Sequence, residues 1–371
     1  MTDKQKLIKK MIREFSEKSL TEEVLEKIDK TGEFPNEILQ EMAKMGLYAL
    51  KAPKYLGGAE VDTLTYVIAL EELSKYSAVA SIYVATPNSL AVGPLLMDGT
   101  EEQKENYIRP IVNGNKKIAF ALNEAEAGSD AAGIATTAIR DGKNYIINGR
   151  KTFITMAPIA DYAIVYAKTK PEKGTKGISS FIIDLKSDGV SIGKEEEKMG
   201  VIGCPTGEIV LNNVVVSNKE LLGKENEGFR TAMKTLNIGR LGVAAQSIGV
   251  AQSALDEAIQ YSKCRQQFGK KLCEFQAISF KLAEMATKLE AGRNLLYTAA
   301  LKEDRKLVAM AKLYCAEICN EICANALQIY GGYGFIKGYK IERLYRDCRV
   351  FTIYEGTSQV QKMIISKELL K

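Results

Sequence analysis

The sequence of 371 residues contains no histidine and no tryptophan. Because histidine is the usual proton-transfer side chain near neutral pH, any such step must use a carboxylate, lysine, tyrosine or cysteine. A Ser-His-Asp triad and a Cys-His pair are both excluded. Without tryptophan, and with the other aromatic residues scattered, the chain offers no platform on which nucleic-acid bases would stack.

Two common phosphate-binding motifs are also missing. No Gly-x-Gly-x-x-Gly motif follows a strand into a helix, so a nicotinamide site of the Rossmann type has no support, and there is no Gly-Lys-Ser/Thr loop. The net charge is a mild +5, and the densest basic cluster, within residues 4–10, lies among acidic residues as on a solvated helix face. We expect no nucleic-acid partner.

No apolar run approaches the ~20 residues that a membrane span requires. The N-terminus carries acidic residues and no apolar segment, which argues against a secretory signal and a transit peptide. Seven cysteines without a Cys-x-x-Cys pair suggest a reducing compartment. We therefore expect a cytoplasmic protein with no membrane insertion.

Three of the cysteines, Cys315, Cys319 and Cys323, recur every four residues and so share one helix face. A three-thiolate metal site is one interpretation, but zinc needs a fourth ligand and none is evident nearby. Small buried core residues are the better interpretation. No metal site is predicted.

The apolar pattern divides the chain into three regions. Residues 1–118 show helical spacing, residues 119–225 alternate with a period of two, and residues 226–371 are helical again in long segments. The stretch 66–91 is apolar enough to form helices buried on several faces. These regions predict an α+β multidomain protein that is mostly α.

The middle region is predicted to contain short strands joined by turns. Asp141-Gly142 is a strong hairpin signal. Regular short spacing of turns favours a small barrel or sandwich over a parallel sheet with crossover helices. The expected strands cover residues 118–122, 135–139, 145–147, 163–166, 178–185 and 209–216.

The last region is predicted to form a helical bundle. Its long helical segments cover residues 229–263, 275–302 and 308–330, and small residues within the first of them would let neighbouring helices approach closely.

The segment Ile353–Gln359 places the carboxylate of Glu355 beside Gly356, at a point where a helix is expected to begin. Such a residue would serve both as a base and as part of a ligand-binding turn. On its own the pattern is also that of an ordinary surface turn.

Four further segments lie at the edges of regular elements. The loop 122–130 follows a strand and offers backbone amides and the Ser129 hydroxyl to a planar heterocycle or a phosphate, or it is simply a connection. Segment 151–155 supplies an aromatic face and a hydroxyl. Segment 265–269 suits a pyrophosphate contact, although its arginine is equally explained by the helix dipole. Paired glycines in 328–334 would let a ligand approach the backbone.

The order and content of these segments resemble the acyl-CoA dehydrogenase family, and most of all its short-chain, butyryl-CoA type. The resemblance runs over essentially the whole chain. It is carried by Phe34-Pro35, Gly128–Asp130, Arg265–Gly269, Gln328–Gly332 and Tyr354–Thr357. It implies an N-terminal helical domain, a small β-barrel-like middle domain and a C-terminal four-helix bundle.

The resemblance implies FAD between the β domain and the bundle. The residues matching contacts to the flavin are Leu122, Asn123, Gly128, Ser129, Phe153, Ile154 and Thr155. Those matching residues that reach the FAD of a neighbouring subunit are Arg265, Phe268, Gln276, Gln328, Gly331 and Gly332. Thr357 and Gln359 match contacts to the adenosine diphosphate part.

Glu355 matches the catalytic base of the family. In some relatives the base instead precedes the arginine of the CoA-binding helix, and here that position is Gly239, which has no side chain. The residues matching contacts to the substrate are Ser129, Asn237, Arg240, Tyr354, Glu355 and Gly356.

The implied reaction is FAD-dependent α,β-dehydrogenation of a short-chain acyl-CoA to the trans-2-enoyl-CoA, or its reversal. Glu355 would remove the α-proton while FAD takes the β-hydride. An electron-transfer flavoprotein would exchange the electrons, and the enzyme would be a homotetramer built as a dimer of dimers. Asn123, residues 125–126 and 156–158, and Asn237 depart from the family pattern. These departures leave open an acyl group on a carrier protein, an unusual CoA ester, or a scaffold that has lost the cofactor.

Overall fold

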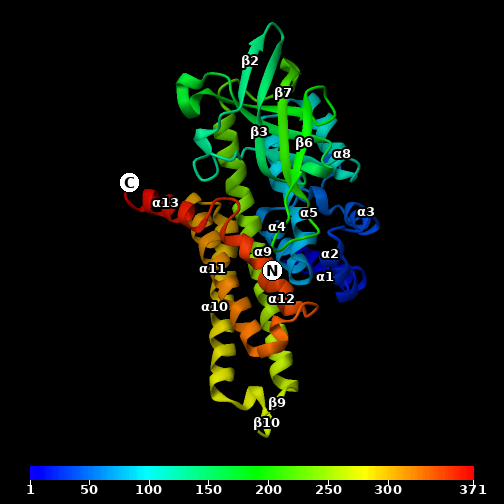
Figure 1. The fold of residues 1–371 in the computed structure, drawn as a ribbon, viewed down its shortest axis with the longest axis vertical. Coiled ribbons are helices and arrows are strands. Elements are labelled where there is room, and N and C mark those ends of the chain that lie inside the picture. The colour runs from blue at the N-terminus through cyan, green and yellow to red at the C-terminus, as the bar shows by residue number, and fades with distance from the viewer.

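The computed structural model describes residues 1–371 and consists of three parts arranged along its long axis (Figure 1). A β-rich part lies at one end, the N-terminal helices lie beside the middle, and long helices form the other end. The helix α9 (Gly228–Cys264) runs from the β-rich part to the far end and is 37 residues long. It therefore contributes to both ends of the molecule.

The N-terminal part is helical, as predicted. Its α-helices are α1 (Asp3–Ser19), α2 (Glu22–Thr31), α3 (Asn36–Lys44), α4 (Thr63–Tyr76), α5 (Ala78–Ala85), α6 (Gly93–Asp98), α7 (Glu101–Gln103) and α8 (Arg109–Val112). Thr2, Thr21 and Asp62 cap three of these helices by accepting hydrogen bonds from backbone N–H groups three residues further on.

One segment corrects the expectation that no run is long enough to cross a membrane. Ala78–Asp98 is a continuous helical stretch of 21 residues that has the length and apolar composition of a span. Within its most apolar window 72% of the residues are buried inside the protein, as for a core helix of a folded domain.

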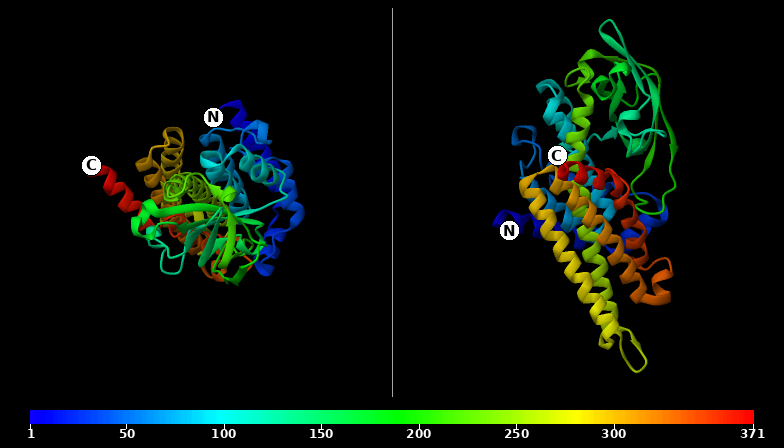
Figure 2. Two further views of the ribbon diagram at one scale, coloured as in Figure 1. Left: turned by 90° about the horizontal axis from the view of Figure 1, so that it is seen from above. Right: turned by 90° about the vertical axis from the view of Figure 1, so that its left-hand side faces the viewer.

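The middle part is a single eight-stranded sheet, mostly antiparallel, with the order β6-β7-β3-β2-β4-β5-β8 and β1 paired in parallel with β4. Figure 2 shows it from above, with the N-terminal helices along one side. Its strands are β1 (Ile118–Ala121), β2 (Thr137–Asp141), β3 (Asn144–Thr155), β4 (Tyr162–Lys168), β5 (Ile178–Asp184), β6 (Val190–Glu195), β7 (Thr206–Ser217) and β8 (Leu221–Leu222).

The hairpin predicted at Asp141-Gly142 is confirmed, since β2 and β3 pair antiparallel on either side of it and Gly142 has a φ of +59°. The strand predictions were incomplete. The strand predicted at 145–147 continues to Thr155, and neither β6 nor β8 was predicted. β6 is an edge strand with few apolar side chains and a glycine, Gly193, and most of it is exposed, so it carries little of the pattern on which a strand prediction depends.

The C-terminal part consists of α9, α10 (Gln276–Lys302), α11 (Arg305–Tyr330), α12 (Lys340–Cys348) and α13 (Ser358–Leu369). The three long helices predicted from the periodicity are confirmed to within three residues at each end. A short hairpin, β9 (Gln266–Gln267) and β10 (Lys270–Lys271), joins α9 to α10 at the tip. The predicted fold class is confirmed. The divisions after residues 118 and 225 remain our proposed domain boundaries.

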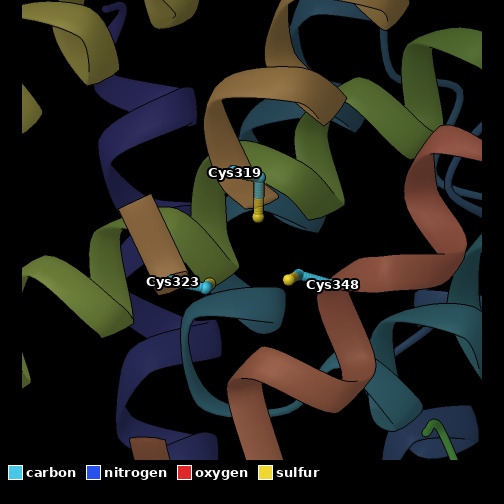
Figure 3. A group of neighbouring side chains, drawn as sticks. All are labelled: Cys319, Cys323 and Cys348. Carbon is cyan, nitrogen blue, oxygen red and sulfur yellow. The ribbon is translucent and has the colours of Figure 1, made fainter. Parts of the chain in front are cut away.

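The cysteines of α11 lie in the main hydrophobic core (Figure 3). The sulfurs of Cys319, Cys323 and Cys348 lie within 4.8 Å of one another, and all three residues are buried. Cys348 comes from the end of α12, whereas Cys315 points elsewhere and donates a hydrogen bond to the Gly292 carbonyl at 3.4 Å. The group supplies three thiols, where structural zinc sites take four ligands.

Candidate active site

Glu355 lies in a sharp turn between the 3₁₀ segment Arg349–Thr352 and α13. Its φ is +57°, and that of Gly356 is +90°. A non-glycine residue in the left-handed region costs on the order of 1 kcal/mol, so the surrounding contacts must hold this conformation. Thr357 caps α13 by accepting a hydrogen bond from the Val360 N–H at 3.3 Å, which is the helix start expected from the sequence.

Three buried side chains hold the two carbonyl groups of this turn. Arg240 Nε donates to the Glu355 carbonyl at 3.2 Å, and Lys312 Nζ donates to the Gly356 carbonyl at 2.7 Å. Gln361 Nε2 donates to both carbonyls, at 3.3 and 2.8 Å. We call Arg240, Lys312 and Gln361 the turn clamp. They come from α9, α11 and α13, so the turn is held from three helices at once.

The carboxylate of Glu355 lies directly against Gly239 of α9. A Cβ atom at Gly239 would stand 2.6 Å from each carboxylate oxygen of Glu355, closer than real Cβ contacts allow. Position 239 therefore faces the carboxylate of Glu355, and a side chain there would compete with that carboxylate for one space. Glycine at 239 is a steric requirement for Glu355 in this position.

The environment gives Glu355 a pKa suited to proton transfer near neutral pH. Burial raises the pKa of Glu355 to about 7, and the charges of Arg240 and Lys312 offset only part of that rise. Its Oε2 is buried and has no hydrogen-bond partner, although the residue as a whole keeps some exposure. An unsatisfied, desolvated carboxylate is poised to take up a proton from a group brought beside it.

Two buried tyrosine hydroxyls interact electrostatically with this carboxylate. The Tyr354 hydroxyl donates to Gln246 Oε1 at 2.6 Å, and Gln246 Nε2 donates to Ser81 Oγ at 3.1 Å, which links the turn through α9 to α5. Tyr66 of α4 is fully buried, and its hydroxyl has no hydrogen-bond partner. Burial raises the pKa of Tyr66, with a smaller contribution from the charge of Glu355.

The predicted substrate contacts on α9 differ in their roles. Arg240 is buried against the turn and donates to the Glu355 backbone. Asn237 Oδ1 is buried with no hydrogen-bond partner, so it is available to a ligand.

The loop 122–129, predicted to face the flavin, is fastened to β3 by a buried ion pair. Lys151 Nζ lies 2.8 Å from Glu124 Oε1 and also donates to the Leu122 carbonyl at 3.1 Å. The Glu124 carboxylate accepts further hydrogen bonds from the backbone N–H groups of Ala135 and Thr136. No motif or spacing in the sequence singles out this pair.

Five of the predicted flavin residues lie in or beside this loop. Leu122 is buried, whereas Gly128 and Ser129 are exposed at its end. Asn123 Nδ2 donates to the Thr152 carbonyl at 3.3 Å, and the Thr152 N–H donates to the Asn123 carbonyl. Asn123 thus closes the loop onto β3. Ile154 is buried in the core of the sheet, which leaves only its backbone for a ligand.

A β-bulge presents Phe153 to the surface. The register of β3 against β7 shifts between Lys151 and Ile154, and Phe153 has a φ of +56°. Its side chain is 63% exposed as a result. Bulges of this kind re-aim side chains next to binding sites. Thr155, two residues on, is partly exposed at the end of β3.

The residues predicted to reach the FAD of a neighbouring subunit lie at the far tip of the bundle. Arg265, Gly331 and Gly332 line one cavity of about 550 Å³, together with Tyr261 and Tyr333. The Arg265 guanidinium stands 5.4 Å from the centre of the Tyr333 ring.

Phe268, on the β9–β10 hairpin, is 93% exposed, and Gln276 and Gln328 are exposed as well. Figure 1 places this tip at the opposite end of the bundle from α13, where Gln359 is exposed. One chain therefore does not bring its two groups of predicted cofactor residues together.

Lys312, Gln361, Gln246 and Tyr66 were missed from the sequence. Of these four residues, only Lys312 has a position in the sequence pattern that marks it as unusual. It follows Val308 by four residues and precedes Cys319 by seven, so it falls on the apolar face of α11. A lysine on such a face needs a buried partner.

Three family models together match nearly the whole chain. They are the acyl-CoA dehydrogenase N-terminal domain over residues 2–115, the middle domain over 119–214 and the C-terminal domain over 226–370. The divisions between them fall near the ends of the helical and strand-rich parts.

Relatives that match over the full length include two proteins named as reductases. The caffeyl-CoA reductase–Etf complex subunit CarC of Acetobacterium woodii is 60% identical, and the 3-(aryl)acrylate reductase of Clostridium sporogenes is 55% identical. Each alignment covers 100% of this chain and 99% of the relative. The solved structure of butyryl-CoA dehydrogenase from Megasphaera elsdenii is 40% identical in sequence, with a TM-score of 0.97. The superposition covers 100% of this chain and 99% of that chain. The family indicated by the sequence motifs is confirmed: the chain belongs to the acyl-CoA dehydrogenase family.

Proposed function

We propose that this protein adds or removes a hydride at Cβ and a proton at Cα of an acyl-CoA thioester and exchanges the two electrons with an electron-transfer flavoprotein, with FAD as its cofactor and Glu355 as the acid–base group. The observation that carries the proposal is the carboxylate of Glu355, desolvated, unpaired and seated against Gly239. FAD, when bound, supplies the acceptor or donor for the hydride at Cβ.

The residues present fit that cofactor. Phe153 is turned outward by the bulge, and the loop 122–129 is fixed beside it by the Glu124–Lys151 pair. At the bundle tip, Arg265 and the paired glycines line a cavity large enough for part of a dinucleotide. Because the two groups lie at opposite ends of one chain, we propose that a second subunit completes each site, within a homotetramer.

Glu355 performs the proton step in either direction. The α-proton of a thioester is a very weak acid, and a carboxylate with an ordinary pKa near 4.3 is a poor base for it. Burial raises the pKa of Glu355 to about 7, which improves the match. In the reductive direction the same carboxyl, protonated, delivers the proton to Cα. The turn clamp keeps the carboxylate in place, and the left-handed conformation of Glu355 leaves its backbone N–H outside any helix ladder.

We propose a 3-aryl-2-enoyl thioester as the preferred substrate and reduction as the physiological direction. Support comes from the two relatives at 60% and 55% identity, which bear the names of a caffeyl-CoA reductase and a 3-(aryl)acrylate reductase. The electron partner is supported likewise, because the first of these is a subunit of an Etf complex. The unpaired Tyr66 hydroxyl is a further buried polar group near the base, available to a substituent on the substrate.

An anaerobic titration tests the proposal. The enzyme with reduced FAD is mixed with a panel of butenoyl-CoA, cinnamoyl-CoA and hydroxycinnamoyl-CoA, and the return of oxidised flavin absorbance is followed. We expect reoxidation by the aryl substrates to be the fastest. Reoxidation by butenoyl-CoA alone would remove the aryl assignment, and reoxidation by none of them would remove the proposed function.

A further inference from the structure

Lys312 is the one lysine of the bundle that is completely buried, with an exposed fraction of 0%. Its ammonium group has three N–H donors but a single hydrogen-bond partner, the Gly356 carbonyl at 2.7 Å. Burying a cation so sparsely satisfied is costly unless another charge compensates it. Among the charged groups around Lys312, Glu355 makes the largest electrostatic contribution.

Lys312 contacts the turn that carries Glu355 at the Gly356 carbonyl. Arg240 and Gln361 hold the Glu355 carbonyl, whereas Lys312 and Gln361 hold the carbonyl of Gly356. Lys312 is thus the part of the turn clamp that acts on the glycine after the base. It holds Gly356, the second of the two left-handed residues, and brings a positive charge to the Gly356 carbonyl.

We propose that Lys312 is a positioning residue for the reaction: through the Gly356 carbonyl it holds Glu355 against Gly239, and through its charge it favours the ionised form of the Glu355 carboxylate. This inference rests on the proposed role of Glu355. Lys312 itself touches neither the substrate nor the reacting atoms.

The charges around the turn agree with this role. Burial lowers the pKa of Lys312 to about 7, and the charge of Glu355 acts against that lowering. Glu317 contributes less, and its carboxylate accepts a hydrogen bond from the Ser358 hydroxyl at 2.5 Å. The titratable and charged groups that interact electrostatically with Glu355, Arg240 or Lys312 are Tyr66 of α4, Arg240 of α9, Arg305, Lys312 and Glu317 of α11, and Tyr354.

The sign of the effect follows from the charge. A cation near a carboxyl favours its ionised form and lowers its pKa, typically by about 1 unit or more at close range. Removing the Lys312 charge should therefore raise the pKa of Glu355. Fewer molecules would then hold an ionised base at pH 7, and the acidic limb of the dehydrogenation profile would move to higher pH.

The experiment measures the pKa of Glu355 directly in the FAD-loaded enzyme. Infrared spectra recorded from pH 5 to 9 follow the C=O band of the protonated carboxyl, which is assigned by its loss in Glu355→Gln. The variants are Lys312→Met and Lys312→Gln, which remove the charge, and Lys312→Arg, which keeps it. Lys302→Met, at the exposed end of α10, is the matched control.

We expect the Glu355 pKa to rise by about 1 unit in Lys312→Met and in Lys312→Gln, and to stay near the wild-type value in Lys312→Arg and Lys302→Met. The pH profile of kcat/KM should shift by the same amount. An unchanged pKa in both uncharged variants would overturn the inference. An equal rise in Lys312→Arg would do so too, because it would reflect disturbed packing.

The two proposals fail in different ways. If the wild-type enzyme turned over no acyl-CoA, the proposed function would be lost, yet the infrared titration would still report whether Lys312 controls Glu355. If turnover is normal and the titration shows no shift, only the inference about Lys312 is lost.

Discussion

Two buried glutamates with lysine neighbours differ in how well they are satisfied. Glu124 contacts Lys151 at 2.8 Å and also accepts hydrogen bonds from Thr136 and Ala135. Burial would raise the pKa of Glu124, but the charge and hydrogen bond of Lys151, together with the hydrogen bonds from Thr136 and Ala135, outweigh it and the pKa is lowered. Glu355 has no such partner on Oε2, and burial raises its pKa to about 7.

The difference separates structure from catalysis. Lys151 donates a hydrogen bond to the Glu124 carboxylate itself. That carboxylate is therefore paired, and it holds the loop 122–129 to β3. Lys312 donates instead to the backbone of Gly356, so the carboxylate of Glu355 is held in position yet stays unpaired. A lysine that bonds the main chain beside a glutamate fixes the residue without neutralising its side chain.

The largest expected effect is that of Glu355→Gln. Loss of the base should lower kcat by about 10³-fold or more, since general acid–base groups contribute roughly 10²–10⁴-fold. FAD should stay bound, because glutamine has the same shape. Steady-state kinetics and the flavin spectrum together check this. Activity near the wild-type level would mean that another group transfers the proton.

The second prediction concerns stability and removes the carboxylate of the other glutamate, Glu124. Glu124→Ala leaves the ammonium of Lys151 buried without its counter-charge, and we expect the free energy of unfolding to fall by about 3–5 kcal/mol. Urea denaturation of the FAD-loaded enzyme measures it. Glu105→Ala, at an exposed pair with Arg109, is the control and should leave stability near wild type. Equal urea denaturation midpoints for Glu124→Ala and Glu105→Ala would show that the Glu124–Lys151 ion pair does not stabilise the fold.

The third effect tests the space shared by Gly239 and Glu355. In Gly239→Ala the new Cβ must displace the carboxylate, and we expect kcat/KM to drop by about 10²-fold, as misplacements of about 1 Å do. In Gly93→Ala, where the nearest atom would be 3.8 Å from the new Cβ, activity should be unchanged. A fully active Gly239→Ala enzyme would contradict the placement of Glu355.

The smallest effect is a pH dependence of stability. A carboxyl whose folded-state pKa is raised binds its proton more tightly in the folded than in the unfolded protein. Stability is therefore lost as pH rises from the unfolded value near 4.5 towards about 7. We expect the Tm of Glu355→Gln minus the Tm of the wild-type enzyme to increase from pH 5 to pH 8. A constant difference in Tm would mean an ordinary pKa for Glu355.

Much of the fold could be predicted from the sequence because periodicity is a local property. The long helices and the Asp141-Gly142 hairpin follow from apolar spacing and one turn motif. The edge strand β6 could not be predicted, since its residues are mostly exposed and it owes its conformation to pairing with β7.

The site divides in the same way. Glu355, Gly239 and Arg240 could be selected because they lie in motifs, and the structure brings the three together. The Glu124–Lys151 pair and Gln361 could not, because their partners depend on how separate elements pack. Lys312 lies between these cases. Its place on the apolar face of α11 marks it as unusual, but its partner 44 residues away becomes visible only in the fold.

The central claim is that Glu355 moves the substrate proton, and one measurement tests it most directly. Wild-type and Glu355→Gln enzymes, both loaded with FAD, are mixed anaerobically with the saturated 3-arylpropionyl-CoA while the oxidised flavin absorbance is recorded in a stopped-flow instrument. We expect rapid bleaching in the wild-type enzyme, at a rate that rises with pH through about 7, and none on that timescale in the variant. Bleaching at the wild-type rate in Glu355→Gln would show that Glu355 is not the group that moves the substrate proton.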